Sequence, residues 1–173
     1  MLEPARYSER EMLGNGRQII IRALRPDDED SLLAVVGQAS VQSLYRRFFG
    51  VRRRFSKREV AFFVNVDFVK HVALAAVTEE AGRTALVGTG RYIVTKPGSA
   101  EVAFAVADEF QDQGIGTMLM RHLATIARDA GLSELTAEVL TENENMLKVF
   151  EKSGLRVNTK QAAEVTHVTM HLR

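Results

Sequence analysis

The chain has 173 residues, of which 46% are hydrophobic and 26% charged, proportions that are ordinary for one globular domain. Its formal net charge of +1 gives no global field that would draw it onto nucleic acid or an anionic membrane, and no apolar run reaches the length of a spanning helix. Cysteine is absent, which excludes disulfides, thiolate catalysis and cysteine-ligated zinc, and fits a cytoplasmic protein.

The N-terminal part of the chain predicts a lead-in, a strand and a helix. Residues 1–16 are polar and end in a Gly-Asn-Gly turn signal, so we interpret them as a lead-in to a single domain spanning residues 17–173. Residues 18–22 are rich in β-branched side chains and predict the first strand. Pro26, followed by two aspartates, opens a helix whose apolar side comes from leucines and valines at 32–36.

Two further helices are predicted before the next strands. One spans residues 41–49, and the other spans 57–64 and begins with a capping box between Ser56 and Glu59. Basic residues cluster beside these helices, and they form either a solvated face or a surface that docks coenzyme phosphates or an acidic protein. The cluster consists of Arg46, Arg47, Arg52, Arg53, Arg54, Lys57 and Arg58.

The rest of the chain alternates strands with two helices. Residues 79–83 predict a hairpin connection that is longer than a tight primed turn, and residues 96–98 predict a second turn. The order of elements indicates an α/β mixture with a largely antiparallel sheet and one strand–helix–strand crossover. Strands are predicted at 71–78, 86–94, 101–106, 135–140, 155–157 and 165–172, and helices at 115–130 and 143–153.

The stretch 101–131 is the one around which the chain is organised. A buried strand leads into the turn QDQGIG at 111–116 and then into a helix with one apolar face. Such a helix start presents free backbone N–H groups at the positive end of the helix dipole, and glycine lets a bulky anion approach. The turn therefore predicts a phosphate or pyrophosphate site, and the alternative is a corner whose glycines serve tight packing.

Two sequence blocks resemble the GNAT family of N-acetyltransferases. The first is the turn at 111–116, which matches the family's acyl-coenzyme A signature: Gln or Arg, two residues, Gly, one residue, and Gly or Ala. The second lies about thirty residues further on and combines Asn143, Met146 and Phe150 with the run EKSG at 151–154. Each block has the structural context that the family requires: the first follows a predicted strand and opens a helix, and the second lies in the predicted helix at 143–153.

This resemblance covers roughly residues 18–172 and implies the fold of the family. The expected architecture is the α/β (α+β) acyl-CoA N-acyltransferase fold, with a mixed, mostly antiparallel sheet of six to seven strands flanked by helices. The sheet is expected to splay between its fourth and fifth strands, which correspond here to 101–106 and 135–140.

The resemblance also implies that acetyl-CoA is the co-substrate and that no metal takes part. Backbone N–H groups of the turn would hold the pyrophosphate, the fourth strand would offer main-chain bonds to the pantetheine, and Asn143 would contact the coenzyme from the far side. The residues implied in coenzyme binding are Phe104, Ala105, Val106, Gln111, Asp112, Gln113, Gly114, Ile115, Gly116, Thr117, Asn143, Met146 and Phe150.

A narrower resemblance is to the catalytic domain of bacterial Pat-type protein lysine acetyltransferases. It runs through ALRPDDEDSL, SLYRRFF, VDFVKHVALAAV and AEVAFAVADEFQDQGIG. It implies direct transfer of the acetyl group to a primary amine in a ternary complex, with a protein lysine, for example on an acyl-CoA synthetase, as the acceptor. Dimers are common among such relatives, so a homodimer is also expected.

The catalytic chemistry is expected at the start of the fourth strand. In Pat-type enzymes a Glu in the matching run is implicated as the general base, and here it is Glu101, with small alanines on its side of the strand. Many family members place a proton-donating Tyr where this chain has Phe150, which cannot donate a proton. Tyr92 is a spare acid candidate, and Glu138 is a second carboxylate candidate.

Two other functions remain open at this stage. One is acetylation of a small amine, which an acidic pocket would favour over a protein lysine. The other is a catalytically weak acyl-CoA binding or sensing module, which the phenylalanine in place of tyrosine favours. Nucleic-acid binding has little support from the net charge.

Overall fold

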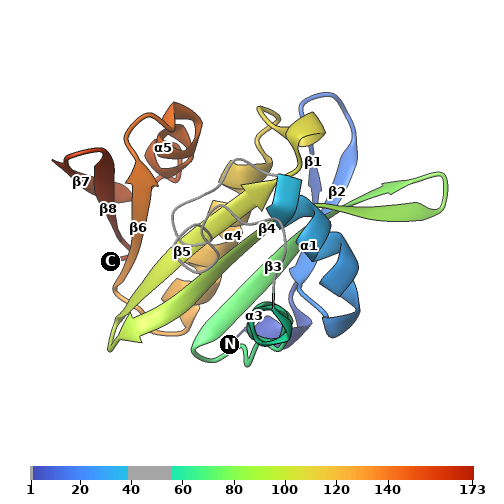
Figure 1. Ribbon diagram of the computed structural model, residues 1–173, viewed down its shortest axis with the longest axis horizontal. Helices are drawn as coiled ribbons and strands as arrows, with labels where there is room; N and C mark the ends of the chain where they lie inside the picture. The colour runs from blue at the N-terminus through green and yellow to red at the C-terminus, as the bar shows by residue number, and fades with distance from the viewer. Residues whose placement is uncertain (1, 39–55) are drawn as a thin grey trace.

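Eight strands form one sheet in the computed structural model, which describes residues 2–38 and 56–173 (Figure 1). The strand order is β1-β2-β3-β4-β5-β6-β8-β7, and every neighbouring pair is antiparallel except β5 and β6, which are parallel. The strands are β1 (Ser8–Met12), β2 (Gln18–Ala23), β3 (His71–Glu80), β4 (Arg83–Lys96), β5 (Ser99–Val106), β6 (Glu134–Leu140), β7 (Arg156–Ala162) and β8 (Val165–His171). This is the mixed, mostly antiparallel sheet that the sequence predicts.

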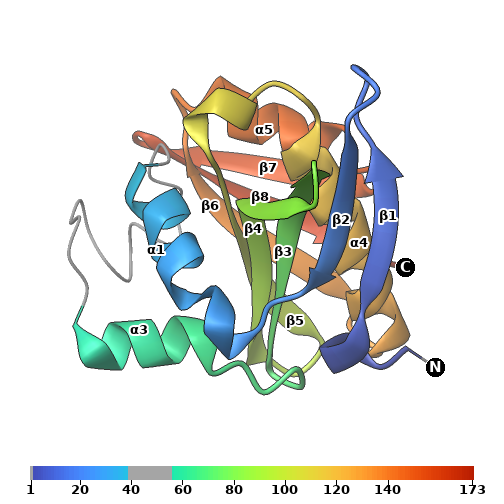
Figure 2. The same cartoon turned by 90° about the vertical axis from the view of Figure 1, so that its right-hand side faces the viewer.

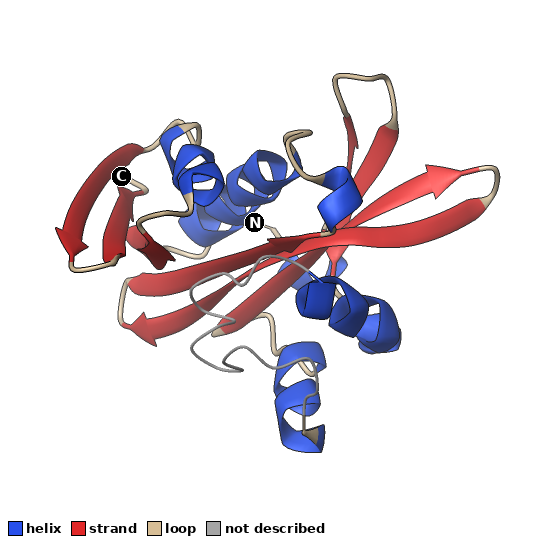
Figure 3. Ribbon diagram, turned by 45° about the horizontal axis from the view of Figure 1, so that its top comes forward, coloured by secondary structure: helices blue, strands red, loops and turns tan. Residues whose placement is uncertain are grey.

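Helices cover both faces of the sheet and divide the core in two (Figures 2 and 3). One core packs α1 (Glu29–Gln38) and α3 (Lys57–Val64) on the sheet, and the other packs α4 (Ile115–Asp129) and α5 (Glu144–Glu151) on the opposite face. Because successive side chains of a strand point to opposite faces, Phe104 lies in the core of α4 and α5, whereas Ala103 and Ala105 lie in that of α1 and α3. Among the described residues, the short 3₁₀ helix η1 (Pro4–Arg6) precedes β1, whereas η2 (Pro26–Asp28) and η3 (Asp108–Phe110) connect larger elements.

The capping box predicted for the helix at 57–64 is confirmed at the start of α3. The Ser56 hydroxyl accepts a hydrogen bond from the Glu59 N–H at 3.1 Å, and the Glu59 carboxylate accepts one from the Ser56 N–H at 2.9 Å. The predicted helix at 41–49 and the arginines at 46–54 lie outside the described residues.

A buried ion pair fixes the chain where β2 leads into η2 and α1. Asp28 accepts two hydrogen bonds from the Arg22 guanidinium, at 2.8 and 2.9 Å, and a third from the Arg25 N–H at 2.8 Å. Burial alone would raise the pKa of Asp28, but the hydrogen bonds from Arg22 and Arg25 outweigh it and lower that pKa. The aspartate that follows Pro26 therefore anchors the helix entry through a charged pair.

The strand β1 corrects the predicted strand count of six to seven. Residues 8–12 fall within the predicted lead-in of 1–16, yet they pair antiparallel with β2 along the edge of the sheet. Their sequence, SEREM, is polar because four of the five residues are exposed. An edge strand that buries neither face shows no alternation of apolar and polar residues, so the period-2 pattern was missing.

The connection between β3 and β4 is also tighter than predicted. The loop is only Ala81 and Gly82, and both have positive φ, 51° and 75°. Positive φ at both central positions is the signature of a primed two-residue hairpin turn, which matches the twist of the strands. The expectation of a five-residue connection was therefore wrong, because the exposed residues 79–80 and 83–85 continue the two strands.

The sheet splays between β5 and β6, as predicted. The two strands pair only from Ser99 to Glu101, and Figure 1 shows β6, β8 and β7 turning away beyond that point. The closed end of this splay is held at Gly98, whose carbonyl accepts hydrogen bonds from the Ser133 N–H at 2.8 Å, the Ser133 hydroxyl at 3.1 Å and the Glu134 N–H at 3.1 Å. The splay thus has a fixed apex and an open end towards Val106.

Candidate active site

The open edge of β5 carries main-chain groups that face the splay. The Ala107 N–H donates to the Val87 carbonyl at 2.8 Å, which shows that the main-chain groups at odd-numbered positions face β4. Because main-chain groups alternate in direction along a strand, those of Phe104 and Val106 face the splay. By the same alternation Ala105 turns its main chain to β4 and its side chain into the core of α1 and α3, so it presents neither to the splay.

The turn between β5 and α4 bends sharply through positive φ. Asp112 has a φ of 63° and Gly114, the residue before the helix, has a φ of 87°. The first hydrogen bond of the helix runs from the Met118 N–H to the Gly114 carbonyl, so the N–H groups of residues 115–117 precede the helical ladder. The start of α4 is therefore the anion-attracting helix end that the sequence predicts.

Two polar side chains of this turn bond back to the protein. The Gln111 amide donates to the Val106 carbonyl and to the Asp108 carboxylate, each at 3.3 Å. The Gln113 amide donates to the Glu109 carbonyl at 3.3 Å. These bonds hold the shape of the turn, and its main-chain N–H groups remain the groups suited to a phosphate.

A cavity of about 280 Å³ lies between the start of α4 and α5. Its wall includes nine of the residues implied in coenzyme binding: Val106, Gln111, Asp112, Gly114, Ile115, Gly116, Thr117, Asn143 and Met146. The lining does not include Phe104, Ala105, Gln113 or Phe150, and it does not include Glu101. The geometry thus brings the two sequence blocks together around one cavity, with the turn on one wall and α5 on the other.

The second block shapes the start and the buried side of α5. The Asn143 side chain caps the helix by accepting a hydrogen bond from the Met146 N–H at 3.2 Å. Phe150 is 2% exposed and packs edge-on against Phe104, with ring centroids 6.1 Å apart. Phe150 therefore belongs to the core that joins α5 to β5.

Gly116 serves close packing between the two cavity walls. A Cβ built on this residue would come within 3.2 Å of Val149 Cγ2 on α5, whereas one on Gly114 would meet nothing within 4 Å. Gly114 is instead required by its positive φ. Glycine is therefore needed at position 114 for its backbone conformation and at position 116 for close packing against α5.

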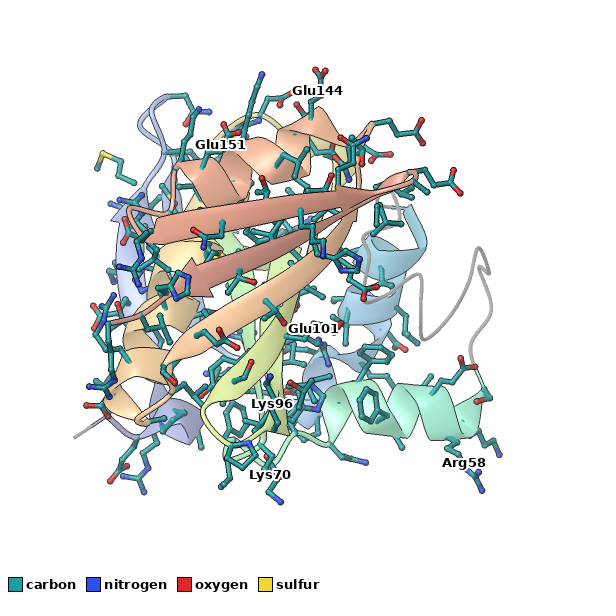
Figure 4. The ribbon with its side chains drawn as sticks, turned by 90° about the vertical axis from the view of Figure 1, so that its left-hand side faces the viewer. Arg58, Lys70, Lys96, Glu101, Glu144 and Glu151 are labelled. Atoms are coloured by element: carbon teal, nitrogen blue, oxygen red, sulfur yellow. The ribbon has the colours of Figure 1, made fainter. Side chains whose placement is uncertain are left out.

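Glu101 lies at the closed end of the splay, on the opposite face from the cavity. It pairs with Ile93 of β4 and with Thr136 of β6, and it is only 7% exposed. Figure 4 shows Glu101 on the side of the molecule where β6 leaves β5, above Lys96 and Lys70. Its side chain shares a face with Ala103 and Ala105, the small residues expected beside it.

A buried basic group lies on the same face as Glu101. Arg91 pairs with Ala103, is fully buried, donates to the Phe63 carbonyl at 3.1 Å and lies 4.5 Å from the centroid of the Phe63 ring. It also contacts His71 Nε2 at 2.9 Å, and because Arg has only donors, His71 accepts this bond as a neutral imidazole. Burial, and then the charge of Arg91, lower the pKa of His71 to about 3.

Of the two other candidates from the sequence, Tyr92 lies on the opposite face, and Glu138 lies on β6 on the same face as Glu101. Tyr92 is 1% exposed and packs in the core of α4 and α5, and burial, followed by the charge of Asp67, raises its pKa to about 12. It therefore does not reach the side on which Glu101 lies. Glu138 is half exposed on β6 and lies 3.7 Å from His167.

The family assignment follows from the comparison with known proteins. A model described as the acetyltransferase (GNAT) family matches residues 35–155. The chain belongs to this family. Acetyl-CoA is accordingly its acyl donor.

Similar proteins include enzymes named as acetyltransferases. An acetyltransferase of Pseudomonas aeruginosa is 30% identical over 126 residues, which make up 72% of this chain and 68% of that protein. The acetyltransferase Pat of Mycolicibacterium smegmatis is 30% identical over 141 residues, 80% of this chain and 41% of that protein. The crystal structure of the GNAT domain of S. lividans PAT is 32% identical, with a TM-score of 0.80, and covers 95% of this chain and 96% of that one. The chain thus spans less than half of the Mycolicibacterium protein.

Several residues of the acetyltransferase cavity were missed from the sequence. All but one of them follow a helical spacing that begins near Asn143. Because Asn143 was predicted to contact the coenzyme, this spacing could have identified them from the sequence. The residues are Asn145, Lys148, Val149 and Lys152 on this side of α5, together with Phe110 of η3.

The described part of the acetyltransferase has neither a metal-binding cluster nor a helix that could span a membrane. Within residues 2–38 and 56–173, His, Asp and Glu side chains form no group of three or more that could hold a metal ion. No helix in the same ranges has the length and apolar character needed to cross a membrane.

Proposed function

We propose that this GNAT acetyltransferase transfers the acetyl group of acetyl-CoA directly to the ε-amine of a protein lysine in a ternary complex. The observation that carries the proposal is the open edge of β5 beside the start of α4, with a cavity of about 280 Å³ at its mouth. The cavity suits the phosphates, and the main-chain groups of Phe104 and Val106 suit the pantetheine arm.

Donor and acceptor would approach from opposite faces of the sheet. The cavity lies between α4 and α5, whereas Glu101 faces the side of α1 and α3. The splay joins the two faces, because β5 and β6 no longer pair beyond Glu101. Separate entries for donor and acceptor suit direct transfer, since both must be bound at once.

Glu101 would remove the proton from the attacking amine, directly or through one water. As the amine nitrogen attacks the thioester carbonyl, the nitrogen–carbon bond forms, the carbon–sulfur bond breaks and the thiolate of the coenzyme leaves. The proton lost by the amine passes to the Glu101 carboxylate and then to solvent. Phe150 cannot protonate the thiolate, and its place in the core supports a structural role.

The charges on the acceptor face favour a single amine over a polyamine. The buried acidic residues of the described chain are Glu101 and Asp28, and Asp28 is paired with Arg22. Arg91 adds a buried positive charge on the face that carries Glu101. A substrate with several cationic groups would need more buried carboxylates there, whereas one lysine ε-amine needs one base.

The narrower parts of the proposal rest on relatives. Two of the similar proteins are named Pat, which supports a protein acceptor such as an acyl-CoA synthetase. A homodimer is proposed because dimers are common among such relatives, and a cytoplasmic location because the sequence has no cysteine. Acetylation of a small amine is the second candidate function, and the assay below separates it.

A thiol-release assay with acetyl-CoA and a panel of lysine-bearing proteins and small amines tests the proposal. Release that needs a protein acceptor supports it, and release only with small amines would assign the second candidate. The Glu101→Gln variant should lose at least about 100-fold in kcat, as expected for removal of a general base. Glu79→Gln, an exposed carboxylate at the end of β3, is the matched control and should keep full activity.

The Glu138→Gln variant separates the two carboxylate candidates. Glu138 lies on β6 on the same face as Thr136, the partner of Glu101. If Glu138→Gln loses activity while Glu101→Gln retains it across the pH range, the base is Glu138 and the assignment of Glu101 fails.

A further inference from the structure

We propose that Lys148 and Lys152 of the α5 region bind the 3′-phosphate of coenzyme A and make the enzyme select the phosphorylated coenzyme over its dephospho form. This inference rests on the proposed function, because it concerns the same donor site. It adds a second anion-binding position, on the wall opposite the start of α4.

The two lysines share the side of α5 that faces the cavity. Both line it, Lys148 from within α5 and Lys152 from the position directly after its last residue, together with Asn145, Met146 and Val149. Residues four apart lie on one helix face, so the two ammonium groups are neighbours. Like charges at this spacing repel each other by a few tenths of a kcal/mol, and a bound anion relieves that repulsion.

Neither lysine is neutralised by the protein. Within residues 2–38 and 56–173, no carboxylate comes within 4.0 Å of either ammonium group. Glu144 lies four residues before Lys148, the spacing that favours a helical ion pair, yet the two side chains form none. Asp112 is the acidic member of the cavity lining, so the wall formed by α5 is positively charged.

The position of the lysines fits a group beyond the pyrophosphate. Val149 touches the first turn of α4, because a Cβ on Gly116 would lie 3.2 Å from its Cγ2. The N–H groups of residues 115–117 belong to the same first turn of α4, and they suit the pyrophosphate. Lys152 follows Val149 by three residues, about 4.5 Å along the helix, away from Asn143 and the splay.

Two walls that attract anions suit a ligand with two anionic groups. Coenzyme A carries a pyrophosphate and a separate 3′-phosphate monoester, and a monoester holds nearly two negative charges at pH 7. Two flexible ammonium groups bind such a point charge well without a planar geometry. The start of α4 would hold the first group, and the lysine pair would hold the second.

Calorimetric titration with coenzyme A and dephospho-coenzyme A tests the proposal. The wild-type enzyme should bind coenzyme A about tenfold more tightly or better, in line with charge-assisted contacts to the extra phosphate. In Lys148→Met/Lys152→Met, binding of coenzyme A should weaken about tenfold while binding of dephospho-coenzyme A changes less than about threefold. The Lys160→Met variant, on the exposed strand β7, is the matched control and should bind both as the wild type does.

Each other outcome has a definite reading. Equal wild-type affinity for the two coenzymes overturns the inference and leaves the proposed function standing. Equal weakening of both ligands in the double variant also overturns it, because the lysines would then act on the pyrophosphate or on the fold. If wild-type enzyme binds neither coenzyme, the inference and the proposed donor site fail together. The single variants Lys148→Met and Lys152→Met give the same comparison if the double variant does not fold.

Discussion

Acidification should destabilise this protein through one buried histidine. His71 is 8% exposed at the start of β3 and accepts a hydrogen bond from Arg91 at 2.9 Å. Burial and the adjacent guanidinium lower its pKa to about 3, although the Asp67 carboxylate opposes the shift. Protonation in the folded state would place two positive charges side by side in a core, so His71 stays neutral there.

The size of the effect follows from the two pKa values. Between about pH 6.5 and pH 3 the unfolded chain binds a proton at His71 that the folded chain does not, so stability falls as the pH falls. The unfolded imidazole has its ordinary pKa of 6.5, and pH 5 is 1.5 units below that value. At 1.36 kcal/mol per unit, this histidine lowers the free energy of unfolding by about 2 kcal/mol between pH 8 and pH 5.

Urea unfolding at pH 8 and pH 5, followed by circular dichroism, measures this loss. The informative variant is His71→Gln, whose side-chain carbonyl replaces Nε2 as an acceptor for Arg91 and does not titrate. The wild type should lose about 2 kcal/mol more than His71→Gln over this pH interval, whatever other groups contribute. His167→Gln, at a histidine 48% exposed on β8, is the matched control and should follow the wild type. Equal losses in the wild type and His71→Gln would refute the reasoning.

Two further predictions concern packing and the ion pair at the helix entry. Gly90→Ala should cost about 1–3 kcal/mol in urea unfolding, because its Cβ would meet two ring carbons of Phe104 at 2.8 and 2.9 Å; Gly14→Ala, where nothing lies within 4 Å, should change stability by less than about 0.5 kcal/mol, and equal costs would contradict the clash. Asp28→Asn should cost about 1–3 kcal/mol at pH 7, because it leaves the half-buried Arg22 guanidinium without its counter-charge. Since the pKa of Asp28 is lowered, the advantage of the wild type should shrink as the pH falls below 3.8, and a constant advantage would contradict the ion-pair account.

The part of the fold that the sequence predicts best is the part with one-sided burial. The helix at 115–130 shows a clean apolar face, and the structure buries that face on the sheet. The strand at 101–106, the glycine turn and the second block also appear where expected. In these elements the local sequence pattern agrees with the tertiary contacts, so they could be predicted from one amino-acid sequence.

The misses come from elements whose surroundings are exposed. The strand at 8–12 pairs through its backbone, and backbone pairing leaves no mark on side-chain type when both faces are wet. The hairpin at 79–83 extends away from the helices (Figure 1), and its exposed polar ends were therefore predicted as loop. Neither segment buries the apolar residues on which a sequence pattern depends.

Parts of the site depend on register, which the sequence did not supply. His71 and Arg91 are twenty residues apart and meet only because β3 and β4 pair in one register, with a bulge between Ala76 and Val77. The same holds for Gly116 against Val149, which depends on how α5 packs on α4. Motif spacing predicts the chemistry of the site, whereas the contacts that surround these residues come from tertiary structure.

The hydrogen bonds at Gly98 make the closed end of the splay a hinge for the donor cleft. Three hydrogen bonds converge on the Gly98 carbonyl, so β6 is tied to the β4–β5 hairpin at one end only. Val106 lies five residues past Glu101, where pairing stops, or about 17 Å along the strand. A rotation of about 5° about Glu101, the last paired residue, would therefore widen the mouth of the cleft by about 1.5 Å. A substitution such as Gly98→Ala, which strains a φ of 81° and presses on the Ser133 hydroxyl at 2.9 Å, would act on coenzyme affinity from the opposite end of the strand.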